Sequence, residues 1–93
     1  MKKTIYVAID TPRKGDGDEF WGKPTFDKAE AVFDAENQLA HMTKNEREKR
    51  IIYVGVFEQE VNDGETAQEA YYRLMEEDEW IMDHNMIEIE EEE

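Results

Sequence analysis

The chain has 93 residues, the size of one domain, and carries 11 basic against 25 acidic side chains, a net charge of −14. This balance argues against an ordinary nucleic-acid-binding domain, because phosphate contacts need Lys and Arg. The absence of cysteine excludes disulfide scaffolds, thiolate zinc sites and thiol nucleophiles. The apolar run near the start is too short for a signal-peptide core or a membrane span, so we expect a cytoplasmic protein with no membrane partner.

The charge is unevenly distributed along the chain. Residues 1–50 hold ten basic and ten acidic side chains, whereas residues 51–93 hold fifteen acids and a single base, Arg73. Such an asymmetry indicates either an interaction surface or a solvated face with an acidic tail that keeps the protein soluble. We expect residues 1–89 to form one domain and residues 90–93 to form the acidic tail.

The start of the chain predicts a β-hairpin. Residues 4–9 are β-rich and read as a strand, with Ile5, Val7 and Ile9 facing the core. Residues 10–18 are rich in turn formers and predict a loop. The short apolar run at residues 19–22 then predicts a second strand that returns along the first.

A helix is expected next, capped by Thr25 or by Asp27, which with Glu30 fits a capping box, and running to about Met42. Residues 43–50 read as the charged end of this helix and its connection. Glu36 falls in the middle of the predicted apolar stripe, where a buried carboxylate would need a partner or a raised pKa.

The second half predicts strand, helix and strand. Residues 51–61 are apolar on both faces, as in a central strand, and a turn at 62–64 follows. Thr66 with Glu69 predicts a capping box for an amphipathic helix. Residues 86–89 alternate and could add a last, edge strand.

This order, β-β-α-β-α with a possible final edge strand, predicts a small α/β (α+β) two-layer sandwich with both helices packed on one sheet face. The opposite face would then carry the aromatic side chains Tyr6, Tyr53 and Phe57. An open face of this kind is a candidate docking surface for a protein adaptor, since aromatic side chains supply large contact area at low entropic cost. The alternatives are a second small core or a homodimer that covers the face.

Few groups of side chains in the sequence could form a catalytic or metal-binding site. Asp10 stands at the end of the first predicted strand, near further loop acids, and could serve a metal-dependent phosphodiesterase or nuclease, or simply start its own turn. The two histidines, His41 and His84, lack the spacing of a zinc site. No nucleotide-binding glycine motif or catalytic triad is recognisable. We therefore expect no cofactor, no metal site and no catalytic residues.

The acidic half supplies the remaining candidate site. Its candidate binding residues are the acids Glu65, Glu69, Glu76, Glu77, Asp78, Glu79, Asp83, Glu88 and Glu90. A dense carboxylate surface can compete with nucleic acid for a basic groove on a protein partner. In size and charge the chain resembles the DNA-mimic inhibitors of phages and mobile elements, such as antirestriction and anti-CRISPR proteins. This resemblance implies a non-enzymatic regulatory protein whose partner is a basic nucleic-acid-binding protein, without direct binding of nucleic acid.

Overall fold

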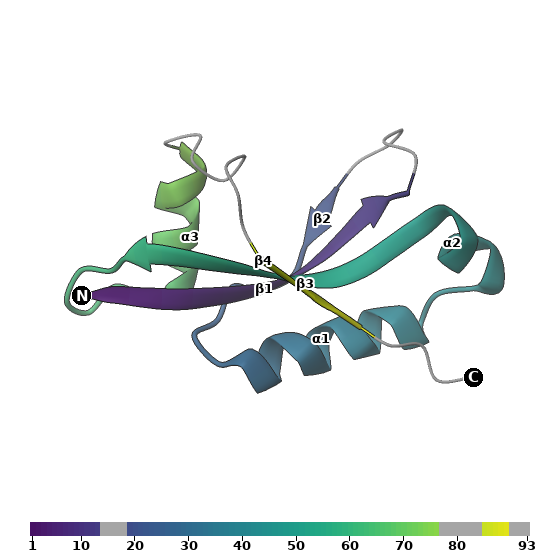
Figure 1. The fold of residues 1–93 in the computed structure, drawn as a ribbon, viewed down its shortest axis with the longest axis horizontal. Coiled ribbons are helices and arrows are strands. Elements are labelled where there is room, and N and C mark those ends of the chain that lie inside the picture. The colour runs from purple at the N-terminus through teal and green to yellow at the C-terminus, as the bar shows by residue number, and fades with distance from the viewer. Residues whose placement is uncertain (14–18, 77–84, 90–93) are drawn as a thin grey trace.

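The computed structural model describes residues 1–13, 19–76 and 85–89 (Figure 1). Its strands are β1 (Lys2–Pro12), β2 (Phe20–Trp21), β3 (Arg50–Glu60) and β4 (Asn85–Glu88). Its helices are α1 (Lys28–Ala40), α2 (Lys44–Lys49) and α3 (Ala67–Glu76). None of the helices in these described ranges is long and apolar enough to cross a membrane.

Strands β2, β1 and β3 form an antiparallel sheet against which the helices pack, so the α+β class is confirmed. The predicted hairpin of the first two strands is confirmed as well, with Ile9 opposite Trp21. β1 and β3 pair over their full length and make a long twisted ribbon. The short strand β4 lies on the outer side of β3, where Asn85 pairs with Val56.

Helices α3 and α1 cover opposite faces of this sheet, so the prediction of two helices on one face is wrong (Figure 1). The register pairs Ile5 with Phe57 and Val7 with Gly55. Side chains directly opposite each other in a strand pair share a face. Ile5 and Val7 therefore lie on the face of Phe57, whereas the sequence predicted Phe57 on the opposite face.

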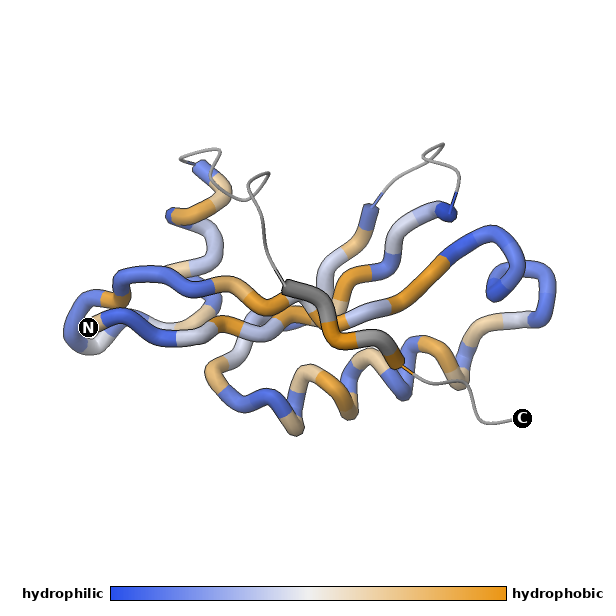
Figure 2. Tube along the Cα trace, viewed as in Figure 1, coloured by the Kyte–Doolittle hydropathy of each residue, from blue (hydrophilic) through white to orange (hydrophobic). Residues whose placement is uncertain are grey.

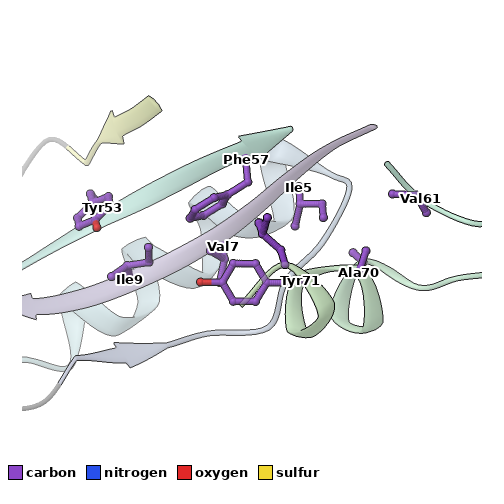
Figure 3. Packing of buried hydrophobic residues seen from close by; sticks show 10 residues of the cluster. Ile5, Val7, Ile9, Tyr53, Phe57, Val61, Ala70 and Tyr71 are labelled. Atoms are coloured by element: carbon purple, nitrogen blue, oxygen red, sulfur yellow. The ribbon is translucent and has the colours of Figure 1, made fainter. Parts of the chain in front are cut away.

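The core under α3 is the larger of two apolar clusters. Figure 3 shows the ring of Tyr71, from α3, lying against Val7 and Phe57 of the strands. The buried members are Ile5, Val7, Ile9, Tyr53, Phe57, Val61, Ala67, Ala70, Tyr71 and Leu74. The predicted amphipathic character of this helix is confirmed as far as the end of α3.

The core under α1 is built from smaller side chains. Its buried members are Ala8, Ala31, Ala35, Ile52 and Val54. Alanine lets α1 approach the sheet closely. Because the alanines of α1 face the sheet, Phe33 lies on the outer side of this helix and is 66% exposed. Glu36 is exposed for the same reason, which corrects the expectation that it lies within the buried stripe.

Capping hydrogen bonds set the helix starts. At α1 the Asp27 carboxylate accepts from the Ala29 N–H, but Glu30 accepts from the Thr25 hydroxyl instead of closing the predicted capping box. A full capping box of Thr43 and Glu46 begins α2. Residues 43–50 are therefore a separate helix and the start of β3, and not the end of the preceding helix.

The capping box of Thr66 and Glu69 is confirmed at the start of α3. The Thr66 hydroxyl accepts from the Glu69 N–H, and the Glu69 carboxylate accepts from the Thr66 N–H at 3.1 Å. The predicted turn before it is confirmed by Gly64, whose φ of 78° is in the region that favours glycine.

Candidate binding surfaces

The single base of the acidic half is engaged within that half. The Arg73 guanidinium lies 2.9 Å from the Glu65 carboxylate and also donates to the carbonyl of Glu60. The hydrogen bond from Arg73 to the Glu65 carboxylate, together with one from the Asn62 N–H, lowers the pKa of Glu65 below its usual value. Arg73 therefore offsets a neighbouring carboxylate and joins the end of β3 to α3.

Two of the candidate acids thus serve the fold. Glu65 holds Arg73, and Glu69 caps α3, whereas Glu76 at the end of α3 is exposed. Glu77, Asp78, Glu79, Asp83 and Glu90 lie outside the described residues, and for Glu88 only the backbone is described.

The neutral half contributes cations to the acidic half at the end of the β1–β3 ribbon. The amino group of Met1 is 2.7 Å from the Glu60 carboxylate, and the Lys2 ammonium is 3.5 Å from that of Glu58. The hydrogen bond from the amino group, followed by its charge, lowers the pKa of Glu60. Both pairs are exposed, so each stabilises the fold only weakly.

The predicted open aromatic face is not formed. Tyr53 and Phe57 are buried at 8% and 6% exposure beneath α3. Tyr6 lies on the other face, half-buried against the cluster under α1. The pairing register of β1 and β3 separates Tyr6 from the other two, because Tyr6 is opposite Val56.

Other aromatic side chains, which the sequence interpretation did not single out, reach the surface instead. The exposed ones are Phe20, Trp21, Phe26, Phe33 and Tyr72. Four of them have partners in the fold: Trp21 meets Tyr71 edge-on at 5.9 Å, Phe20 lies 5.3 Å from the Arg50 guanidinium, Phe26 lies under the Lys3 ammonium, and the Tyr72 hydroxyl accepts from the Gln68 amide. For Phe20 and Trp21 the available signal was the shortness of the apolar run at residues 19–22, since so short a strand buries little of its own side chains.

Asp10 is part of an ion pair. Its carboxylate accepts from the Arg50 guanidinium at 2.6 Å, and both side chains are about four-fifths buried, with 17% and 20% exposure. Arg50 also donates to the carbonyl of Asp10. Within the ranges that the structure describes, no three His, Asp or Glu side chains are grouped to hold a metal ion. His41 is exposed at the end of α1, and His84 lies outside these ranges.

A hydrophilic tip lies at the end of the molecule opposite the turn between β3 and α3 (Figure 2). Here the Arg13 N–H donates to the carbonyl of Lys49, and the Arg13 side chain donates to that of Arg47. The tip thus gathers Arg13 with the basic residues of α2, Lys44, Arg47 and Lys49. These bases therefore lie at the opposite end of the β1–β3 ribbon from Glu58 and Glu60.

A shallow hollow of about 310 Å³ lies between the end of β2 and α1, lined by Gly22, Lys23, Thr25, Glu30 and Asp34. Its two carboxylates already accept hydrogen bonds, Glu30 from the Thr25 hydroxyl and Asp34 from the Gln38 amide. We assign no ligand to it.

Compared with protein families, curated proteins and solved structures, the chain matches none.

Proposed function

We propose that this protein is a non-enzymatic acidic regulator of the DNA-mimic type, which occupies the basic nucleic-acid groove of a protein partner. The observation that carries the proposal is the charge of residues 51–93, where fifteen acids face one base. That base, Arg73, is engaged with Glu65 and the backbone of Glu60. The acidic half therefore presents negative charge that its own side chains do not balance.

A groove that binds nucleic acid attracts closely spaced negative charge, and a protein surface of the same sign competes for it. Such attraction speeds encounter and selects the partner more than it adds affinity, and salt weakens it. The basic tip at α2 lies at the opposite end of the β1–β3 ribbon from Glu58 and Glu60.

Two other functions fit the structure less well. An adaptor that binds through Tyr6, Tyr53 and Phe57 needs these side chains on one open face, and the strand register separates them. A metal-dependent phosphodiesterase needs Asp10 free to bind a cation, whereas its carboxylate is engaged by Arg50. No observation favours either of these over the acidic regulator.

The test is capture of a partner followed by competition. The immobilised protein is exposed at low salt to a nuclease-treated host lysate, and retained proteins are eluted in parallel with salt and with duplex DNA. We expect a nucleic-acid-binding protein that both eluents release. If nothing is retained, or if the retained partner resists both salt and duplex DNA, the proposal is wrong.

A matched pair of variants checks that the acidic half makes the contact. Glu76→Gln with Glu77→Gln removes two charges from the acidic half, and Glu36→Gln with Glu48→Gln removes two exposed charges from the neutral half. We expect the first pair to weaken binding of the captured partner roughly fivefold, because an exposed ion pair contributes up to about 1 kcal/mol. The second pair is expected to bind like the parent, and equal losses would contradict the proposal.

A further inference from the structure

Among the residues that the structure describes, the outer backbone edge of strand β4 pairs with no other strand, and the hydrogen-bond pattern of the sheet shows which residues form it. Tyr6 exchanges both backbone hydrogen bonds with Thr25, so its N–H and C=O point away from β3. In an antiparallel sheet this direction alternates from residue to residue. The neighbours of Tyr6, Ile5 and Val7, therefore hydrogen-bond to Phe57 and Gly55 of β3. The alternate β3 residues, Val54 and Val56, direct their N–H and C=O groups toward β4.

The same alternation then applies to β4. Val54 pairs with Ile87, and Val56 pairs with Asn85, so these two β4 residues point their backbone groups inward. Met86 and Glu88 consequently direct their N–H and C=O groups outward. In the ranges that the structure describes, no strand pairs with this outer edge.

The two edges of the sheet are protected differently. On the β1 side, β2 and the bridge from Tyr6 to Thr25 cover the middle and end of the strand, and Lys2 and Lys3 stand at its start. Lysine on an edge strand discourages pairing with other chains. Residues 85–93 hold no lysine, proline or glycine, and five of the nine are Glu.

We propose that the outer edge of β4 binds an extended, Lys/Arg-rich segment of the protein partner by addition of a strand. The outward groups of Met86 and Glu88 would supply the backbone hydrogen bonds, and the acidic residues around them would select the positive charge. A second copy of this chain is a poor occupant, because its own β4 would place Glu near Glu across the pair. This inference rests on the proposed function and names the element of the partner that is bound.

The probe is a synthetic peptide of alternating Lys and Thr, as long as an ordinary strand. Its control repeats Lys-Pro-Pro-Lys, which keeps the charge but places prolines on both edges of the extended peptide, so that neither edge keeps an unbroken row of N–H donors. We expect the Lys–Thr peptide to bind about tenfold more tightly, as the loss of a few backbone hydrogen bonds implies. Amide hydrogen exchange of Met86 and Glu88 should slow when it binds.

Variants at Met86 separate backbone from side chain. Met86→Pro removes an outward N–H and spares the inward bonds of Asn85 and Ile87, whereas Met86→Ala keeps the N–H. We expect the proline variant to lose the tenfold preference and the alanine variant to retain it. Unchanged exchange of the Ile87 amide in Met86→Pro verifies that β4 stays in place. If it detaches, Glu88→Pro, compared with Glu88→Gln, makes the same test.

The outcomes are distinct. Equal binding of the two peptides, unaffected by Met86→Pro, overturns strand addition but leaves the acidic regulator standing on its own competition test. Binding of neither peptide also overturns strand addition, and the capture experiment then decides the proposed function separately. A dimer of the parent protein that Met86→Pro dissociates would assign the edge to a second copy and would overturn the proposal as well.

Discussion

At the scale of single residues, Tyr71 organises the core under α3. Tyr71 is 2% exposed, and its ring lies near that of Phe57 (Figure 3). The two rings meet edge-on at 5.3 Å, and the Tyr71 ring meets that of Trp21 at 5.9 Å. Burial, and next the charge of Glu19, raises the pKa of both Tyr71 and Tyr53. Both hydroxyls therefore stay neutral over the physiological range, and the rings contribute mainly through packing.

Replacing Phe57 by alanine tests whether this face is closed. We expect Phe57→Ala to lower the free energy of unfolding by about 3–5 kcal/mol, because it empties a buried site. The control Phe33→Ala, at a side chain that is 66% exposed, should change it by less than about 0.5 kcal/mol. Urea unfolding measures both, and equal effects would mean that Phe57 lies on an open surface.

The ion pair of Glu65 and Arg73 predicts a pH-dependent stability. Because the folded-state pKa of Glu65 is lowered, its contribution is complete above the ordinary Glu pKa and is lost as the pH falls through the lowered value. Glu65→Gln should therefore reduce Tm at neutral pH, and its difference from the parent should shrink in acid. Thermal unfolding across this range, with Glu36→Gln as control, checks this, and a difference that is constant with pH would refute it.

At the scale of elements, the β1–β3 ribbon joins the two cores. Gly55 lies opposite Val7 in this ribbon, and a Cβ there would approach Ile9 Cδ1 to 2.8 Å and Phe57 Cε2 to 2.9 Å. These side chains are buried under α3 and have little room to move. The missing side chain of Gly55 thus lets the large ring of Phe57 fold over the strand.

Gly55→Ala is accordingly expected to destabilise the protein by about 1–3 kcal/mol through overpacking. In the double variant with Phe57→Leu, the smaller side chain should relieve the contact, so the combined loss should be less than the sum of the two single losses. Denaturant unfolding of the four proteins measures this coupling. Strictly additive losses would show that the two residues do not compete for the same space.

At the scale of the whole molecule, the charge of −14 opposes compactness as well as attracting partners. The described ion pairs are few, and two of them lie exposed at the end of the ribbon. Repulsion among the remaining carboxylates should therefore be the larger electrostatic effect at low salt, where screening is weak.

The Tm of the parent protein should rise by several degrees when salt is added from low to physiological concentration, because screening reduces this repulsion. The variant with Glu76→Gln and Glu77→Gln should start from a higher Tm at low salt and gain less from added salt. Calorimetry in salts of equal ionic strength checks both statements. A Tm that falls with salt would mean that attractive pairs, such as Glu65 with Arg73, outweigh the repulsion.

Local sequence determined where most elements lie and how the charge is divided. The alternation of residues 4–9 and the apolar run of β3 are patterns of neighbouring side chains, and the Thr66–Glu69 capping box consists of hydrogen bonds between residues three apart. These features can therefore be recognised without a structure. The capping box of Thr43 and Glu46 was equally recognisable from the sequence. The prediction missed α2 because it took residues 43–50 as the end of the preceding helix.

Only the tertiary structure decided which residues share a face. Both strands of the ribbon are apolar on both sides, so periodicity could not say whether Ile5 lies beside Phe57 or beside Val56. A shift of one residue in the pairing would exchange the two faces. That choice depends on contacts between residues about fifty positions apart, and it buries Tyr53 and Phe57 under α3 while placing Tyr6 beneath α1.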